Sequence, residues 1–550
     1  MSRSADPRFT LEVAGMTCDD CAQHVAEALT GAGAREVAVD WRAGRARFSR
    51  PDGVFEQPLR AAVEAAGYRP GALARAGAAA SQAASGTDFD LLVVGSGSAA
   101  FAAAIRAVEG GLRVGMVEQG TLGGTCVNVG CVPSKALLRA TETLWVAGHH
   151  PFAGAPTSAA APDLGAMVSQ KDGLVAELRS AKYQGLVADY GFEVVSGHGR
   201  FTGPGELRVA ERTLTARTFL VATGASPIVP PIKGLEEGGF LTSTTALQLT
   251  AVPARLAVIG SSAIGLELGQ LFLHLGARVT FIDVAERVAP LEEPEAAARL
   301  GQLLQEEGAR VLAPAEVVEV VPGPTGRVLR VRSAAGEEKV EVDSILVAVG
   351  RSPNTRGLGL ELAGVEVDRR GAVVVDSHLR TSNPQVFAAG DVTGGPQFVY
   401  VAAYQGQLAV GNALLGDDRE VDLLGLPRVT FTSPQLASAG LTEAEARAGG
   451  MEVAISVMPL AAVPRALVNR DTRGLVKLVA EAGSGRLLGA TVLADGAGDV
   501  ISAAVLAIRH GITTSELAAT LHPYLTMAEG LKLAAQTFTR DVGRLSCCAA

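Results

Sequence analysis

The sequence of 550 residues lacks any uninterrupted apolar run of the roughly 18 residues that a membrane-spanning helix needs. Its first segment, MSRSADPRFT, lacks the apolar stretch of a secretory signal, so we expect a cytoplasmic protein with reduced thiols. It also lacks a Lys/Arg-rich stripe interleaved with aromatic residues, and its formal net charge is −9. Because a negative field repels polyanions, nucleic acid is not an expected partner.

Cysteine is scarce, but its distribution is informative. A secreted disulfide framework would need far more cysteine per residue. The six cysteines fall into three close pairs, Cys18/Cys21, Cys126/Cys131 and Cys547/Cys548. Three thiol pairs in a reducing compartment indicate redox or soft-metal chemistry.

The chain is long enough for three to five domains at roughly 100–200 residues each. Residues 8–70 predict a small ferredoxin-like βαββαβ domain, and residues 71–87, rich in Ala, Gly and Ser, predict a flexible linker. From residue 88 onward, strand-like runs alternate with helical patterns, which is typical of doubly wound α/β domains. From residue 421 the pattern changes to an α+β terminal domain.

The first motif is a dinucleotide-binding loop of the form G-x-G-x-x-A. A buried strand, Leu91–Val94, leads into Gly95, Gly97 and Ala100, and the next strand ends at Glu118. The first glycine allows the tight turn, the second lets backbone approach a pyrophosphate, and the acid can accept from a ribose hydroxyl.

A second loop repeats this plan, with Gly260 and Gly265 at its ends, Ser262 at the middle position and Asp283 ending the following strand. It predicts a nicotinamide dinucleotide site. An acid at that position accepts from a free 2′-hydroxyl and repels a 2′-phosphate, which favours NADH. NADPH stays open, because Arg278 and Arg287 are close in sequence.

The segment GGTCVNVGCVPSKALL places Cys126 and Cys131 at the start of a helix. A helix N-terminus lowers the pKa of a thiol, which makes it a nucleophile and a metal ligand. The pattern G-T-C-x-x-x-x-G-C-x-P-S-K resembles the redox-active segment of the pyridine nucleotide-disulfide oxidoreductases, and the resemblance spans the chain from Asp88 onward.

This resemblance implies an FAD-binding domain over 88–226, an NAD(P)-binding domain over 227–350, a return to the first over 351–420, and a dimerisation domain over 421–550. It implies a redox-active disulfide at Cys126/Cys131 and a homodimer. By residue matching, the flavin contacts would be Ala100, Glu118, Gly120, Thr125, Lys135, Gly199, Asp391 and Val399. On residues alone, Asp391 could equally be a loop-capping acid.

Two features depart from the disulfide-reducing members of that family. Their C-terminal H-P-x-x-x-E segment supplies a general acid/base His, whereas HPYLTMAEG aligned on Glu529 places Tyr524 there. A phenol is a poor proton shuttle at pH 7, although His522 could substitute after a register shift. The second departure is the tail, GRLSCCAA, whose vicinal cysteines suit a thiophilic cation.

Together with VPRALVNRDTRG (463–474), these features resemble the mercury-reducing members of the family. The resemblance implies that Cys547 and Cys548 capture Hg(II) from small thiols and pass it to Cys126 and Cys131. The tail and Tyr524 of one subunit would complete the other subunit's site, and Tyr183 would join Tyr524 at the metal. Without the resemblance, Tyr183 reads as a helix-surface aromatic.

Cys18 and Cys21 form a C-x-x-C loop at the start of a helix, preceded by Gly-Met-Thr. The unit resembles the heavy-metal-associated domains of copper chaperones, which implies a metal site whose selectivity the loop does not specify. A thioredoxin-like redox site is the alternative for this module. For the whole chain, the alternatives are a reductase of small disulfides and a metal carrier without enzymatic activity. Mercury-transport or carrier proteins are possible partners.

Overall fold

The computed structural model describes residues 8–49, 56–75 and 86–544. The chain divides into two compact units. Unit 1 comprises Met1–Gly124, Tyr183–Gly224 and Pro353–Val421, and unit 2 comprises Thr125–Lys182, Ala225–Ser352 and Asp422–Ala550. Within the described ranges, none of the helices is both long enough and apolar enough to cross a bilayer.

The N-terminal part of unit 1 has the predicted βαββαβ order and a four-stranded sheet in the order β2-β3-β1-β4. Its elements are β1 (Arg8–Ala14), α1 (Asp19–Gly31), β2 (Arg35–Asp40), β3 (Arg45–Ser49), α2 (Glu56–Ala65) and β4 (Arg69–Arg75). Val25 and Leu29 of α1 and Phe48 of β3 belong to its core. The last strand, β4, continues to Arg75, beyond the end of the domain expected at residue 70. Leu73 and Arg75 pair with Leu11 and Phe9 of β1, on the edge that β3 leaves open.

The rest of unit 1 is built on a sheet in the order β7-β6-β5-β10-β9-β8, with β20 also paired to β10. Strands β5, β6, β7, β10 and β20 run parallel, and all six residues of β5 are buried. The strands are β5 (Phe89–Val94), β6 (Val114–Glu118), β7 (Glu193–Ser196), β8 (Gly199–Gly203), β9 (Glu206–Val209), β10 (Arg212–Val221) and β20 (Val386–Ala388). The helices are α3 (Ser98–Glu109), α7 (Gly185–Tyr190), η3 (Asp391–Thr393), α12 (Val399–Val410) and η4 (Gly411–Leu415).

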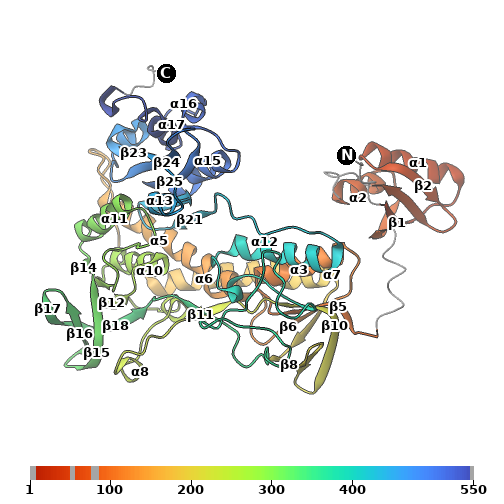
Figure 1. The fold of residues 1–550 in the computed structure, drawn as a ribbon, viewed down its shortest axis with the longest axis horizontal. Helices are drawn as coiled ribbons and strands as arrows, with labels where there is room; N and C mark the ends of the chain where they lie inside the picture. Colours follow the sequence, from red (N-terminus) through yellow and green to blue (C-terminus); the bar gives the residue numbers. More distant parts are fainter. Residues whose placement is uncertain (1–7, 50–55, 76–85, 545–550) are drawn as a thin grey trace. The chain divides into compact units, whose positions relative to one another are not determined.

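Helix α12 runs beside α3 (Figure 1). Their backbones approach so closely that a Cβ on Gly406 would collide with the carbonyl oxygen of Ala99. This contact needs small residues, and it brings two segments about 300 residues apart in sequence onto the same sheet.

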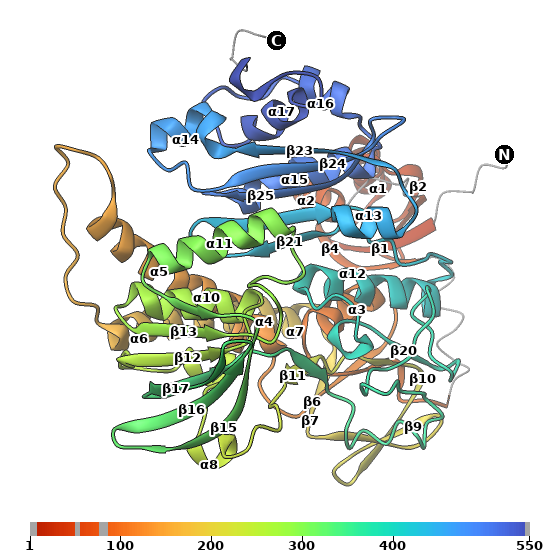
Figure 2. The same cartoon turned by 60° about the vertical axis from the view of Figure 1, so that its left-hand side comes forward.

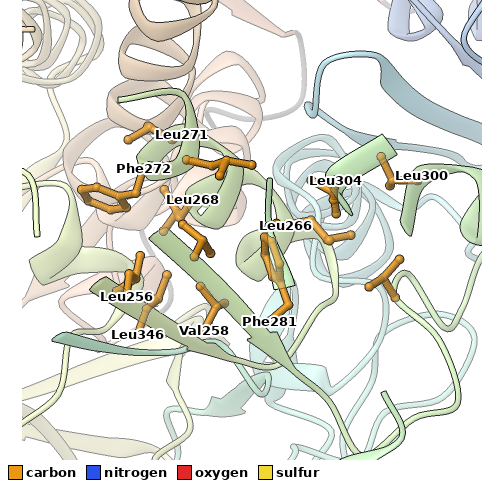
Figure 3. Close-up of a cluster of buried hydrophobic side chains, with 14 of the residues drawn as sticks. Leu256, Val258, Leu266, Leu268, Leu271, Phe272, Phe281, Leu300, Leu304 and Leu346 are labelled. Atoms are coloured by element: carbon orange, nitrogen blue, oxygen red, sulfur yellow. The ribbon is translucent and has the colours of Figure 1, made fainter. Parts of the chain in front are cut away.

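In unit 2, a parallel sheet in the order β14-β13-β12-β18 carries the second dinucleotide loop. Between β14 and β18 in the chain comes a three-stranded antiparallel sheet, β15-β16-β17. Side chains from β12, β13, α10 and α11 form one buried cluster (Figure 3). The elements are β11 (Ala225–Pro227), α8 (Leu235–Gly238), α9 (Ser243–Ala246), β12 (Arg255–Ile259), α10 (Ala263–His274), β13 (Arg278–Ile282), α11 (Pro294–Glu306), β14 (Arg310–Leu312), β15 (Ala315–Gly323), β16 (Gly326–Ser333), β17 (Gly336–Val342), β18 (Ser344–Val347) and β19 (Arg351–Pro353).

Unit 2 also contains the thiol segment and the C-terminal domain, whose antiparallel sheet has the order β21-β22-β25-β24-β23 (Figure 2). The thiol segment runs through α4 (Gly124–Val129), α5 (Cys131–His149) and α6 (Leu164–Arg179). The π-helical turn η2 (Ser180–Gln184) spans the boundary between the units, and its Tyr183 belongs to unit 1. The C-terminal elements are β21 (Pro427–Thr430), β22 (Gln435–Gly440), α13 (Glu443–Ala448), β23 (Val453–Pro459), η5 (Leu460–Ala462), α14 (Pro464–Asn469), β24 (Leu475–Glu481), β25 (Leu487–Ala494), α15 (Ala497–Arg509), α16 (Thr514–Ala519), α17 (Glu529–Gln536) and η6 (Val542–Arg544).

Candidate active site

The two thiols of the CVNVGC segment lie on either side of a break between two helices. Cys126 is in α4, and Cys131 is the first residue of α5, as the sequence predicts. Gly130 makes the break possible, because a Cβ there would come 2.9 Å from the carbonyl oxygen of Thr125. Both cysteines are free thiols in this structure.

The two thiols share a hydrogen bond, and it separates their pKa values. The hydrogen bond from Cys126 lowers the pKa of Cys131 to about 6, with help from the charge of Lys135. The same hydrogen bond, together with burial, raises the pKa of Cys126. A thiolate at the first position of a helix is further favoured by the helix dipole. The shared hydrogen bond therefore favours the thiolate form of Cys131 and the protonated form of Cys126.

Lys135, one turn after Cys131, is fixed by contacts with two residues from distant parts of unit 2, Glu267 and Phe431. Its Nζ lies 2.7 Å from Oε2 of Glu267 on α10, whose side chain is buried. Oε1 of Glu267 accepts a hydrogen bond from the backbone N–H of Phe431 at 2.9 Å. The ammonium also lies 4.7 Å from the centre of the Phe431 ring. The thiolate thus has a cation held at a defined place.

The first dinucleotide loop has the geometry that the motif predicts. Gly95 has φ +112°, and a Cβ on it would collide with the carbonyl oxygen of Ala222 at the end of β10. Gly97 begins α3 as its N-cap with φ −77°, and a Cβ there would meet nothing within 4 Å. Neither backbone strain nor crowding within the protein therefore requires glycine at 97. The open space at the helix N-terminus fits a dinucleotide pyrophosphate.

The second loop is built in the same way. Gly260 has φ +97°, and a Cβ on it would collide with Ala348 at the end of β18. A Cβ on Gly265 would collide with the carbonyl oxygen of Gly260, so this glycine allows α10 to pack on β12. Ser262 is the N-cap of α10, is exposed, and makes no side-chain cap hydrogen bond. This loop also fits a dinucleotide.

Asp283 follows the carboxyl end of β13, where the sequence predicts it. The two arginines close to it in sequence, Arg278 and Arg287, lie in different surroundings. Arg278 is the first residue of β13, and its charge acts on Asp343 at the opposite end of the sheet from the loop. Ligands of parallel sheets bind at the carboxyl ends of strands, and Arg278 lies at the other end of its strand. Arg287 donates through Nη2 to the carbonyl oxygens of Pro290 and Glu292.

Most of the remaining predicted flavin contacts of unit 1 lie beyond the carboxyl ends of its parallel strands. Glu118 ends β6, Gly120 follows it, and Asp391 follows β20 and begins the turn η3. Val399 begins α12, and Ala100 is fully buried in α3. Whether these residues contact FAD stays a prediction.

Two predicted flavin residues have structural roles. Gly199 begins β8, and a Cβ there would come 3.1 Å from Leu207 and 3.3 Å from Val117, so packing within the sheet accounts for its small size. Thr125 packs against Gly130 at the helix break. Their contact with FAD also stays a prediction.

The aromatic residues expected at the metal are in different elements. Tyr183 lies in the π-turn η2, and its ring packs edge-on against Phe101 at 4.8 Å, so it is not a free surface aromatic. Such π-turns often mark functional sites. Tyr524 is 56% exposed, in the segment before α17. Nδ1 of His522 lies 3.2 Å from the carbonyl oxygen of Thr520. Cys547 and Cys548 lie outside the described residues.

Cys18 and Cys21 form the second described thiol pair, with their Sγ atoms 3.0 Å apart at the start of α1. The hydrogen bond from Cys18 is the main cause that lowers the pKa of Cys21 to about 6, and Thr17 and Tyr68 add further hydrogen bonds. Over the described ranges, no group of three or more His, Cys, Asp or Glu side chains gathers as a metal site. The described thiol pairs therefore offer two sulfur ligands each.

Several contacts were not foreseen from the sequence. Glu267 and Phe431 reach Lys135 from segments more than 130 residues away, and no local pattern marks them. Nη1 of Arg179 donates at 3.2 Å to Asn128, between the two cysteines. Ser96 and Ser261 hydrogen-bond to the acids of the two loops. The last pair had a sequence signal, since serine follows the first glycine in both loops.

Comparison with known families gives two matches. The family model described as "Pyridine nucleotide-disulphide oxidoreductase" matches residues 89–406. The model of that family's dimerisation domain matches residues 426–535.

Similar proteins over nearly the whole chain include a mercuric reductase of Staphylococcus aureus, 47% identical over 98% of this chain and 99% of its own length. A mercuric reductase of Lysinibacillus sphaericus is 46% identical over 98% of this chain and 100% of its own length. A mercuric reductase of Streptomyces lividans is 50% identical over 84% of this chain and 99% of its own length.

Among solved structures, LpdA from Mycobacterium tuberculosis is similar with a TM-score of 0.74 and 29% identity, over 82% of this chain and 100% of that one. The HOCl-induced flavoprotein disulfide reductase RclA from Escherichia coli is similar with a TM-score of 0.73 and 29% identity, over 81% and 99%.

Proposed function

The chain belongs to the pyridine nucleotide-disulphide oxidoreductase family, and on this basis we propose that it is an enzyme that reduces Hg(II) to Hg(0) with electrons from NAD(P)H. The observation that carries the proposal is the Cys126/Cys131 pair, with one thiolate and one thiol at a helix break. Two sulfur ligands match the preference of a soft cation, and the relatives over nearly the full chain are mercuric reductases.

The chain's residues perform the exchange of ligands. The Cys131 thiolate attacks thiol-bound Hg(II), a new Hg–S bond forms, and the carrier thiolate leaves. Cys126 then loses its proton and replaces the second carrier thiolate. Because each step exchanges one Hg–S bond for another, transfer is fast although binding is tight. When bound, the flavin supplies two-electron transfer between reduced nicotinamide and the metal held by the thiols.

The balance of the reaction is NAD(P)H and Hg(II) giving NAD(P)⁺, H⁺ and Hg(0). Reduction of a thiol-bound metal needs no proton donor at the metal. This agrees with Tyr524 at the position where disulfide-reducing members have a His. The residues that would hold FAD are those of the first loop with Glu118 and Asp391, and those for the nicotinamide nucleotide are the second loop with Asp283.

NADH is the proposed preferred nucleotide. The Asp283 carboxylate accepts hydrogen bonds from Ser261 and from the backbone N–H of Ala285, which hold it as an anion beside the loop. A carboxylate there repels a 2′-phosphate. Arg278 is too far along the strand to compensate, and Nη2 of Arg287 is engaged by backbone carbonyls.

A homodimer is the proposed assembly, because residues 426–535 match the family's dimerisation domain. In this assembly Tyr524, Tyr183, Cys547 and Cys548 complete the metal path, with the tail cysteines capturing Hg(II) first. Residues 8–75 serve as an additional metal-capturing domain through Cys18 and Cys21. The cytoplasm is the proposed location, because reduced thiols and NAD(P)H are both maintained there.

The second candidate is a reductase of small disulfides, and it is favoured by the similarity to RclA, a flavoprotein disulfide reductase. It would require His522 to replace the missing acid/base residue.

The deciding experiment follows the oxidation of NADH or NADPH by the purified protein with excess small thiol and either Hg(II) or an oxidised disulfide. We expect oxidation that depends on Hg(II) and is lost in Cys126→Ala, with His522→Gln close to wild type. Oxidation with the disulfide but not with Hg(II), and its loss in His522→Gln, would establish the second candidate instead.

A further inference from the structure

Each dinucleotide loop has a buried serine directly after its first glycine. Ser96 is 1% exposed, and its Oγ donates to Oε2 of Glu118 at 2.6 Å. Ser261 is fully buried, and its Oγ donates to Oδ2 of Asp283 at 2.7 Å. The two serines occupy equivalent places in loops 165 residues apart, and each hydrogen-bonds to the acid that is expected to bind a ribose.

The equivalence extends to the segment after each acid. Gly120 N–H donates to the second carboxylate oxygen of Glu118 at 2.6 Å, and Ala285 N–H donates to that of Asp283 at 2.9 Å. Each carboxylate is therefore held through both oxygens, by the serine on one side and by a backbone N–H two residues later on the other. Such a carboxylate cannot rotate without losing a charge-assisted hydrogen bond.

Each serine also ties down the loop that follows the acid. The N–H of Gly123 donates to Oγ of Ser96 at 3.1 Å, which leaves the Ser96 hydroxyl proton for Glu118. In the second site the N–H of Ala289 donates to the carbonyl oxygen of Ser261 at 2.9 Å. The serine thus joins three parts of each site: the glycine loop, the acid and the segment after it.

We propose that Ser96 and Ser261 are positioning residues that pre-orient the ribose-binding carboxylates, Ser96 in the flavin site and Ser261 in the nicotinamide site. A carboxylate has about four lone-pair sites. Asp283 also accepts from the backbone N–H of Ser261 at 2.6 Å, and with these three donors it still has capacity for a ribose hydroxyl, as Glu118 has with two. Because the side chain is immobilised before the ligand arrives, binding does not have to order it. The inference rests on the proposed flavin and nicotinamide sites, and it does not depend on which metal is reduced.

The experiment measures binding in the holoenzyme with single variants that act as controls for each other. In Ser96→Ala we expect the flavin to leave the diluted holoenzyme about tenfold faster, as reported by free-flavin fluorescence, with an unchanged Kd for oxidised nicotinamide nucleotide. In Ser261→Ala we expect the calorimetric Kd for that nucleotide to rise about tenfold, with unchanged flavin release.

Two further variants keep the result decisive. Ser96→Gly and Ser261→Gly remove the same hydroxyls without adding bulk, and they replace any alanine variant that does not fold. Ser333→Ala, in the exposed β16–β17 hairpin, is the surface control. Unchanged flavin release in the Ser96 variants, or equal effects of each variant on both ligands, would overturn the inference. A wild-type protein that holds no flavin would instead overturn the proposed function.

Discussion

The Nζ atom of Lys135 lies 2.7 Å from Oε2 of Glu267, and this ion pair joins the helix that starts at Cys131 to the helix that starts at the second dinucleotide loop. Glu267 is 5% exposed, and its other oxygen accepts from Phe431 N–H in the C-terminal domain. Three separate segments of unit 2 therefore determine where the lysine charge lies. That charge is one of the causes that keep Cys131 as a thiolate.

The first prediction concerns the charges around Cys131. Lys135→Met should raise the pKa of Cys131 above about 6, because a favourable charge is removed. Glu267→Gln should lower it, because the Glu267 charge opposes the thiolate. The measurement is the ultraviolet absorbance of the thiolate against pH, taken as the difference between each protein and its Cys131→Ser counterpart. Lys135→Arg, which keeps the charge, is the matched control, and shifts of the same sign in Lys135→Met and Glu267→Gln would contradict the argument.

The second prediction concerns the hydrogen bond between the thiols. Cys126→Ala removes the largest cause of the low pKa of Cys131, so its pKa should rise further than in Lys135→Met. The sign follows from linkage: a thiolate with a lowered pKa is present above that pKa and is lost as the pH falls through it. In wild type, capture of Hg(II) by this pair should therefore slow as the pH falls below about 6. Stopped-flow capture rates across this range are the test, and a rate that stays constant down to pH 5 would contradict it.

The third prediction concerns nucleotide choice. Asp283→Asn removes the charge that opposes a 2′-phosphate, so we expect the ratio of kcat/KM for NADH to that for NADPH to fall by about tenfold, equivalent to about 1.4 kcal/mol. Arg278→Ala should leave this ratio unchanged, because Arg278 lies at the opposite end of β13. If this ratio changed as much in Arg278→Ala as in Asp283→Asn, the carboxylate at the carboxyl end of β13 would not be what selects the nucleotide.

The local features of both nucleotide sites could be predicted from the sequence, because each depends on residues within one strand, turn and helix. Gly95, Gly97, Glu118 and Asp283 all lie where the motif places them. Arg278 shows that a residue close in sequence to Asp283 does not have to be close to it in space. It is five residues from Asp283, but a strand rises about 3.3 Å per residue, which carries it to the other end of the sheet.

Contacts between distant segments could not be predicted from one sequence. Glu267 reads as one polar residue in an apolar helix, and only the fold brings it to Lys135. The end of the N-terminal domain could not be located from the sequence either, because the Ala/Gly-rich residues of β4 resemble the linker that follows. They form a strand only because they pair with β1.

The last prediction concerns stability. Lys477 on β24 is 1% exposed, and its Nζ lies 2.9 Å from carboxylate oxygens of Glu293, Glu295 and Glu443. Glu293 and Glu295 lie at the start of α11, and Glu443 lies at the start of α13. One buried ammonium therefore joins β24 to both helices. Lys477→Met would leave Glu293, itself 2% exposed, without its cation. Breaking a buried pair on one side costs about 3–5 kcal/mol, so we expect a clear fall in Tm.

The pH dependence distinguishes this electrostatic loss from a packing defect. Lys477 lowers the pKa of Glu443, so its contribution is present above the ordinary glutamate pKa of about 4.3 and is lost as acid titrates Glu443 in the folded protein. The Tm difference between wild type and Lys477→Met should therefore be large at pH 7 and shrink toward acid. Lys339→Met, an exposed lysine of β17, is the matched control and should show little change at any pH. A Tm difference that stays the same from pH 7 to well below pH 4, where Glu443 is protonated in the folded protein, would assign the loss to packing, because removal of a methylene chain costs the same whether or not the acids around it are ionised.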